Sequence, residues 1–284
     1  MHSRRDLTSD FRALGVAPGD VVMVHASVRA VSEIAGGPDE IHLALKDVLT
    51  AEGTLLMYAG CPRYVDEVGR GNLSAEQEAE LLEKLPAFDA DTARSDRSNG
   101  ALVELLRTYP GSRVNHHVAR FVAWGAQAEY LLSRQPWDYA FGRDSALDRF
   151  VALDGKILLL GSDLDAVTFL HYAEHIVDIP DKRVARFKVP VMEGGVRVWR
   201  DMAEFDTATG AHANWPDDFF GRIVTSHLAA SANRGGPVGE AWCYLLGARD
   251  LLDFALPVMR RVAADAAAVD ALRVPPPPPG KRGV

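Results

Sequence analysis

Hydrophobic and polar positions follow two periods along the chain, and the order of these periods predicts an α/β fold. Short apolar runs that are typical of buried strands occur at 21–24, 54–58, 121–124 and 156–161. Runs with apolar residues three and four positions apart, typical of amphipathic helices, occur at 8–14, 39–49, 102–109 and 127–132. Because strands and helices succeed one another, we expect a sheet covered by helices.

The second half of the chain predicts further elements. A helix is expected over about 167–177, directly after the strand at 156–161, and a hairpin over 187–198 with its turn at Gly194-Gly195. Helical spacing is also expected at 240–246 and over most of 248–269. We therefore predict a single domain over 1–274. Two segments fall outside the regular pattern: a polar, acidic excursion at about 62–98 with one helix at 75–82, and a Pro-rich tail at 275–284 that we expect to be disordered.

Composition narrows the class of protein. The 284 residues are 48% hydrophobic and 25% charged, which excludes disordered and fibrous classes. With 31 basic and 39 acidic residues the net charge is −8, so a nucleic acid partner is not expected. No run approaches the roughly 18 apolar residues of a membrane span, and Cys61 and Cys243 form no extracellular disulfide pattern. A cytoplasmic protein without membrane attachment is expected.

One predicted helix carries three polar side chains on a single stripe. His171, Glu174 and His175 lie at positions i, i+3 and i+4, directly after the strand at 156–161. In one interpretation His171 is a general base that Glu174 orients. In a second, the string matches the zinc signature H-x-x-E-H, with Glu174 activating water. A solvated helix face is the third, and this spacing alone leaves all three open.

Other residues lie at positions where ligands bind in α/β proteins. His25 and Ser27 follow the first strand, and Cys61 follows the second. Arg113 and His116 come after a helix-stopping Pro-Gly, on a loop that can meet phosphate. The sequence contains no G-x-S-x-G elbow, no Walker P-loop and no G-x-G-x-x-G turn. Common hydrolase and nucleotide-binding classes therefore receive no support.

Five blocks of sequence, in matching order along nearly the whole chain, resemble the aminoglycoside 3-N-acetyltransferase family. They lie at 14–27, 86–104, 110–116, 158–183 and 236–250. The fourth block is the most specific, because a buried Leu-Leu-Leu-Gly strand end precedes the string Leu-His-Tyr-Ala-Glu. Each block alone is weak, whereas five in order make a specific resemblance.

This resemblance implies a three-layer α/β/α fold around a central mixed sheet, of the antibiotic N-acetyltransferase type and distinct from the common acetyltransferase fold. It implies transfer of acetyl from acetyl-CoA, without a metal, to the 3-amino group of 2-deoxystreptamine aminoglycosides, which confers antibiotic resistance. By the family pattern His171 and Glu174 belong to the catalytic centre, and His175 lies outside the matched motif. The implied CoA contacts are His25, Ser27, Val28, Arg29, Ala30, Val31, Ser95, Arg113, Val114 and His116.

The chain departs from the family pattern at three positions. Val114 and His117 stand where the family usually has Ser and Pro around the loop histidine, so a hydroxyl contact to CoA is lost there. Ala146 replaces a usual Pro after Ser145, and we expect this turn to be looser.

A polycationic acceptor needs carboxylates in its pocket. The strand-end loops and the acidic excursion supply candidates, with aromatic side chains as walls. The predicted substrate contacts are Tyr64, Asp66, Glu67, Asp96, Glu104, Trp137, Asp138, Asp163 and Asp206. We expect acidic side chains to gather around the acceptor, while Arg113 and Arg29 lie near the anionic CoA.

The expected mechanism is direct transfer in a ternary complex, because no residue is marked as a nucleophile. His171 would take the proton of the attacking amine, and Glu174 would stabilise the imidazolium. The alternatives are a zinc hydrolase that uses His171, Glu174 and His175, and a CoA-dependent acetyltransferase of another amine. The sequence leaves open both a monomer and a homodimer, and also which aminoglycosides are preferred.

Overall fold

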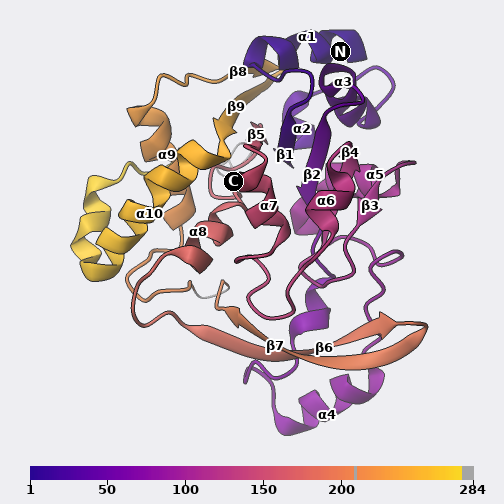
Figure 1. Ribbon diagram of the computed structural model, residues 1–284, viewed down its shortest axis with the longest axis vertical. Helices are drawn as coiled ribbons and strands as arrows, with labels where there is room; N and C mark the ends of the chain where they lie inside the picture. Colours follow the sequence, from indigo (N-terminus) through magenta and orange to yellow (C-terminus); the bar gives the residue numbers. More distant parts are fainter. Residues whose placement is uncertain (208–209, 277–284) are drawn as a thin grey trace, which may run out of the picture.

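Seven strands form one mixed sheet in the order β3-β4-β2-β1-β5-β9-β8 (Figure 1). The computed structural model describes residues 1–207 and 210–276. The strands are β1 (Val21–Ala26), β2 (Thr54–Tyr58), β3 (Arg113–Val114), β4 (Phe121–Gly125), β5 (Lys156–Leu160), β8 (Gly236–Val238) and β9 (Ala241–Gly247). β1 pairs in parallel with β2 and β5, whereas β4 and β9 run antiparallel to their neighbours. The predicted central mixed sheet is therefore confirmed.

Helices cover both faces of this sheet. One face packs on α1 (Arg4–Leu14), α3 (Asp39–Leu49) and α5 (Ala101–Thr108), and the other on α6 (Ala128–Leu132), α7 (Ala146–Ala152), α8 (Leu170–Ile176), α9 (Phe219–Ala230) and α10 (Ala248–Ala264). Alternate residues of β1 enter the two cores: Val22 and Val24 face the first set, and Val21 and Met23 the second. The three-layer α/β/α fold is thus confirmed. Within the described residues no helix is both long and apolar enough to cross a membrane.

A two-stranded hairpin lies apart from the main sheet, at the end of the molecule opposite α1 (Figure 1). It consists of β6 (Val184–Glu193) and β7 (Val196–Phe205), so the predicted hairpin exists and is longer than expected. The turn residues Gly194 and Gly195 have φ of 56° and 80°, a conformation that favours glycine.

The acidic excursion packs against this hairpin. It contains η1 (Arg63–Asp66), α4 (Ala75–Lys84) and η2 (Arg97–Asn99), and single bridges join Val68 to Lys188 and Phe88 to Val191. Phe88 shares a small apolar core with Val189 of β6 and Met202 of β7. The excursion and the hairpin together form one wall beside the sheet.

Two predicted elements differ in the structure. The segment 240–246, expected to be helical, forms β9, which pairs antiparallel with β5 through Leu160 and Cys243. Ala241, Cys243 and Leu246 are buried. An apolar run this short is compatible with both the helical and the strand period, and pairing with a neighbouring strand decides between them. The helix predicted over 248–269 ends at Ala264, and a 3-10 turn, η3 (Ala266–Ala271), follows. The tail at 275–284 is predicted to be disordered. Of these residues, 277–284 lie outside the described part of the chain.

Candidate active site

Parallel pairing brings three strand ends to one edge of the sheet. Ala26 at the end of β1 lies opposite Leu160 at the end of β5, and Met23 of β1 lies opposite Leu56 of β2. The side chains of His25 and Tyr58 and the loop 161–168 therefore meet at this edge. Ligands of α/β proteins bind outside such carboxyl ends of strands.

Two cavities open at this edge. The sheet-edge cavity, about 710 Å³, lies between the end of β1, the loop after β5 and the start of α5; its walls include Ser27, Arg29, Ala101, Gly161 and Asp163. The hairpin cavity, about 390 Å³, lies between this edge and the β6–β7 hairpin; its walls include Cys61, Arg70, Phe141, Asp165, His171, Phe187 and Glu204. Both cavities share Tyr58, Asn99, Ala166 and Thr168. Molecules in the two cavities would touch at these four residues.

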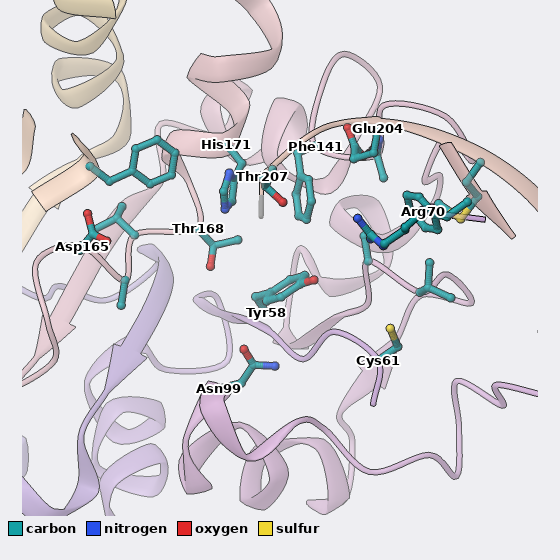
Figure 2. A pocket seen from close by; sticks show the side chains of 18 residues that line it. Tyr58, Cys61, Arg70, Asn99, Phe141, Asp165, Thr168, His171, Glu204 and Thr207 are labelled. Atoms are coloured by element: carbon teal, nitrogen blue, oxygen red, sulfur yellow. Dashed lines mark hydrogen bonds between the residues drawn. The ribbon is translucent and has the colours of Figure 1, made fainter. Parts of the chain in front are cut away.

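His171 lies at the wall of the hairpin cavity, near this junction. Its Nδ1 and Oε2 of Glu174 are 2.5 Å apart. Since a carboxylate only accepts hydrogen bonds, Nδ1 carries the hydrogen of this bond, and in the neutral form of the ring Nε2 is then the nitrogen with the lone pair. The side chain of Glu174 is 5% exposed and that of His171 is 24% exposed. Figure 2 shows the His171 ring directed into the cavity, on the side where Thr168 and Tyr58 lie.

Several contacts fix the His171 ring and the helix that carries it. Phe141 and Phe220 flank the imidazole, with ring centroids 5.2 Å and 4.9 Å away. The hydroxyl of Tyr172 donates to Asp148 of α7 at 2.5 Å. The ammonium of Lys182 donates to the carbonyl oxygens of Glu174 and His175, 2.8 Å and 3.0 Å away, at the end of α8. The imidazole thus has little rotational freedom.

A third hollow, about 290 Å³, also borders His171. It shares His171, Asp165, Thr207 and Phe220 with the hairpin cavity and adds Asp217. Asp165 accepts a hydrogen bond from the backbone N–H of Gly221 at 2.7 Å, yet burial raises the pKa of this carboxyl. Asp165 and Asp217 therefore provide acidic groups beside the imidazole.

The two histidines of α8 do not converge on one point. His171 Nδ1 faces Glu174, whereas His175 Nδ1 faces the carbonyl oxygen of His171, 2.6 Å away, and His175 Nε2 faces Glu204 of β7. Among the described residues, no group of three or more His, Cys, Asp or Glu side chains is arranged to hold a metal ion. The zinc interpretation of H-x-x-E-H does not fit this geometry.

Comparison with known proteins identifies the family. The model of the aminoglycoside 3-N-acetyltransferase family matches residues 23–260. The chain belongs to this family. It is 39% identical over 260 residues to aminoglycoside N(3)-acetyltransferase III of Pseudomonas aeruginosa, covering 90% of this chain and 92% of that protein. Identity to the type VII enzyme of Streptomyces paromomycinus is 39% over 258 residues, 89% of each chain. The family resemblance is thus confirmed, and the protein is an acetyltransferase.

Solved structures of this family share the fold. The binary complex of AAC-IIIb with CoASH has a TM-score of 0.85 at 40% identity, over 91% of this chain and 96% of that chain. The sisomicin-bound AAC-VIa structure determined by neutron and X-ray diffraction has a TM-score of 0.84 at 34% identity, over 91% and 98% of the two chains.

The residues predicted to contact CoA fall into two places. His25, Ser27, Val28 and Arg29 line the sheet-edge cavity. The short helix α2 (Val28–Val31) continues from them and buries Val31 completely. Arg113, Val114 and His116 instead line a hollow of about 510 Å³ near Arg107 and Glu129, which shares no lining residue with the sheet-edge cavity among those the structure describes. Ser95 uses its backbone N–H to bind Glu104.

The three departures from the family pattern have local explanations. Val114 belongs to β3 and pairs with Val122. His117 is buried, its Nδ1 accepts from the N–H of Ala119 at 2.9 Å, and burial lowers its pKa to about 4. Ala146 is the first residue of α7, a position where proline and alanine are both accepted. The Ser145 hydroxyl caps this helix through the N–H of Asp148.

Most predicted substrate contacts lie away from the hairpin cavity. Asp163 lines the sheet-edge cavity, and Glu104 pairs with Arg107 and Arg94, which lower its pKa to about 2. Other predicted contacts make local structural interactions or face solvent. Asp96 caps η2, and Asp138 accepts a hydrogen bond from the N–H of Ala203. Trp137 packs against His117 with the two rings tilted, and Tyr64 is 49% exposed. Glu67 and Asp206 are absent from the described lining of the hairpin cavity. The side chain of Asp66 lies outside the described part.

Among the described residues, the acids that line the hairpin cavity are Asp165 and Glu204, neither of which is among the predicted substrate contacts. Asp165 follows the predicted Asp163 by two residues on the same strand-end loop, and the two side chains line different cavities. Glu204 lies on a strand of mixed polarity and gave no comparable signal.

The substitution His25→Gln should leave the pH dependence of kcat between pH 5 and pH 8 unchanged. Burial, together with the nearby His171, lowers the pKa of His25 to about 4, so its neutral form persists down to about that pH. Acetyl transfer is measured across this range at saturating acetyl-CoA in both proteins. Loss of an acidic limb in the variant would show that His25 titrates within the window.

Proposed function

We propose that the protein transfers an acetyl group from acetyl-CoA to the 3-amino group of 2-deoxystreptamine aminoglycosides. The observation that carries this proposal is the His171–Glu174 pair beside the junction of two cavities. Family membership adds the reaction class. The related AAC-IIIb binds CoASH and the related AAC-VIa binds sisomicin in their solved structures, and these two ligands indicate the donor and acceptor classes of the proposal.

The sheet-edge cavity suits the donor. Its volume of about 710 Å³ is the larger of the two, and Arg29 brings a cation to it. Gly100 and Ala101 begin α5 within its wall, and the unbonded N–H groups of a first helical turn favour anions such as a diphosphate. The thioester of acetyl-CoA would then reach the junction at Tyr58 and Thr168.

The acceptor amine occupies the hairpin cavity, next to His171. Nε2 of His171 takes a proton from the amine, and the amine nitrogen attacks the thioester carbonyl. The new C–N bond replaces the C–S bond, and the leaving thiolate receives a proton from the imidazolium. Glu174 stabilises this imidazolium, while the Thr168 hydroxyl is available to the oxyanion. Transfer is direct, without an acetylated side chain.

Acetyl-CoA and a panel of aminoglycosides and simple amines test the proposed function. Thiol release should accompany acetylation of the 3-amino group of at least one deoxystreptamine drug, with simple amines far slower. The intact mass of the enzyme with acetyl-CoA alone should stay unchanged. Acetylation of simple amines alone would indicate a different acceptor class, and an acetyl adduct on Cys61 would contradict direct transfer.

The substitution His171→Ala should lower kcat by about 10²- to 10⁴-fold, because this is the range of general-base assistance. Acetyl-CoA binding should persist, since His171 is not among the residues that line the sheet-edge cavity. Calorimetry with acetyl-CoA and steady-state kinetics measure the two quantities. As a control, His227→Ala changes a histidine of α9 that packs on Phe254, away from both cavities. Near-wild-type kcat in His171→Ala would remove this residue from the base role.

The substitution Asp165→Asn should raise KM for kanamycin about tenfold and leave KM for acetyl-CoA unchanged. The amide keeps an oxygen for the Gly221 N–H but loses the charge that attracts an ammonium, and one charged hydrogen bond contributes about 1.5–3 kcal/mol. Asp163→Asn, two residues earlier on the donor side, is the matched control. Equal effects of the two substitutions on KM for kanamycin would mean that the acceptor lies elsewhere.

A further inference from the structure

A second histidine–carboxylate pair lies one helical turn behind His171. His175 Nε2 faces Oε1 of Glu204, and His175 Nδ1 lies 2.6 Å from the carbonyl oxygen of His171. The side chains of His175 and Glu204 are only 2% and 10% exposed. This pair joins α8 to the β6–β7 hairpin, which is remote in the sequence.

Both ring nitrogens of His175 face hydrogen-bond acceptors. The carbonyl oxygen of His171 can only accept. Glu204 also accepts from the N–H of Phe205 at 2.9 Å and from the N–H of Ala140 at 2.7 Å, so both of its oxygens act as acceptors. A hydrogen bond from the ring to each of these acceptors requires a hydrogen on each ring nitrogen.

Glu204 also connects this pair to the ring of His171. Its Oε2 holds the backbone N–H of Ala140, and the next residue, Phe141, packs against His171 with ring centroids 5.2 Å apart. Phe141 contacts the His175 ring as well, at 5.9 Å. Three segments thus meet at one carboxylate: α8, the end of β7 and the loop that carries Phe141.

We propose that His175 and Glu204 are positioning residues for acetyl transfer, an inference that rests on the proposed function. The pair holds Phe141 and α8 so that Nε2 of His171 keeps its direction toward the acceptor. Glu204 lines the hairpin cavity, but both of its oxygens are engaged by His175, Ala140 and Phe205. These contacts use three of the roughly four acceptor positions of the carboxylate, so we assign Glu204 to stabilising the wall and not to binding a substrate ammonium.

The substitutions Glu204→Gln and His175→Ala should each lower kcat about 10- to 100-fold, because small displacements of a catalytic group have effects of this size. KM for kanamycin should stay within about twofold, since neither residue touches the acceptor. The double variant should be no slower than the slower single variant, because the two act as one unit. Asp201→Asn, an exposed acid on the same strand, is the control with unchanged kcat and KM.

Several outcomes would overturn the inference. A large rise in KM for kanamycin with kcat retained would make Glu204 a substrate contact, and multiplying losses in the double variant would make the two residues independent. His175→Gln, which keeps a donor toward Glu204, should recover part of the kcat lost in His175→Ala; no recovery would count against the pairing.

Nitrogen-15 NMR of the wild-type protein, which needs no variant, should find N–H groups at both His175 ring nitrogens, and a single N–H would contradict the pair. If the wild-type enzyme itself transfers no acetyl to an aminoglycoside, the proposed function fails instead.

Discussion

The parallel pairing of β1 with β2 and β5 is the constraint on which the site depends. It places the ends of three strands side by side and so gathers His25, Tyr58 and the loop 161–168. The chain turns sharply after β5 at Gly161, where φ is 58° and a Cβ would lie 2.6 Å from that of Ala30. Close approach of α2 to this turn shapes the sheet-edge cavity, and a side chain at Gly161 would force the two apart.

The sequence predicted the sheet strands of the active edge because they are short, apolar and bounded by turn residues. It also predicted His171 and Glu174, since helical spacing of three residues puts both on one stripe whatever the surroundings. Three-dimensional contacts decided the rest. β9 is a strand because β5 pairs with its edge, and Glu204 contacts His175 because the hairpin folds back onto α8; neither relation has a local signal in the sequence.

Charge is distributed differently from the simple expectation of an acidic pocket. The hairpin cavity contains Asp165 and Glu204 but also Arg70, whose guanidinium lies 4.2 Å from the centre of the Phe187 ring. Glu204 is paired with His175 and Glu174 with His171, which leaves Asp165 and Asp217 as the other described acids that line the two hollows sharing His171. The net charge of −8 therefore says little about the site, because many acidic side chains lie in surface ion pairs.

The walls of the hairpin cavity come largely from segments that contribute nothing to the central sheet. Phe187, Met202 and Glu204 belong to the hairpin, and Cys61 and Arg70 lie beside or within the excursion packed against it. Under the proposed function, substitutions at the hairpin positions that face this cavity would alter the acceptor side, while the strands, α2 and α5 keep the donor side intact. Such an architecture would let acceptor selectivity change without rebuilding the part of the site that holds the thioester.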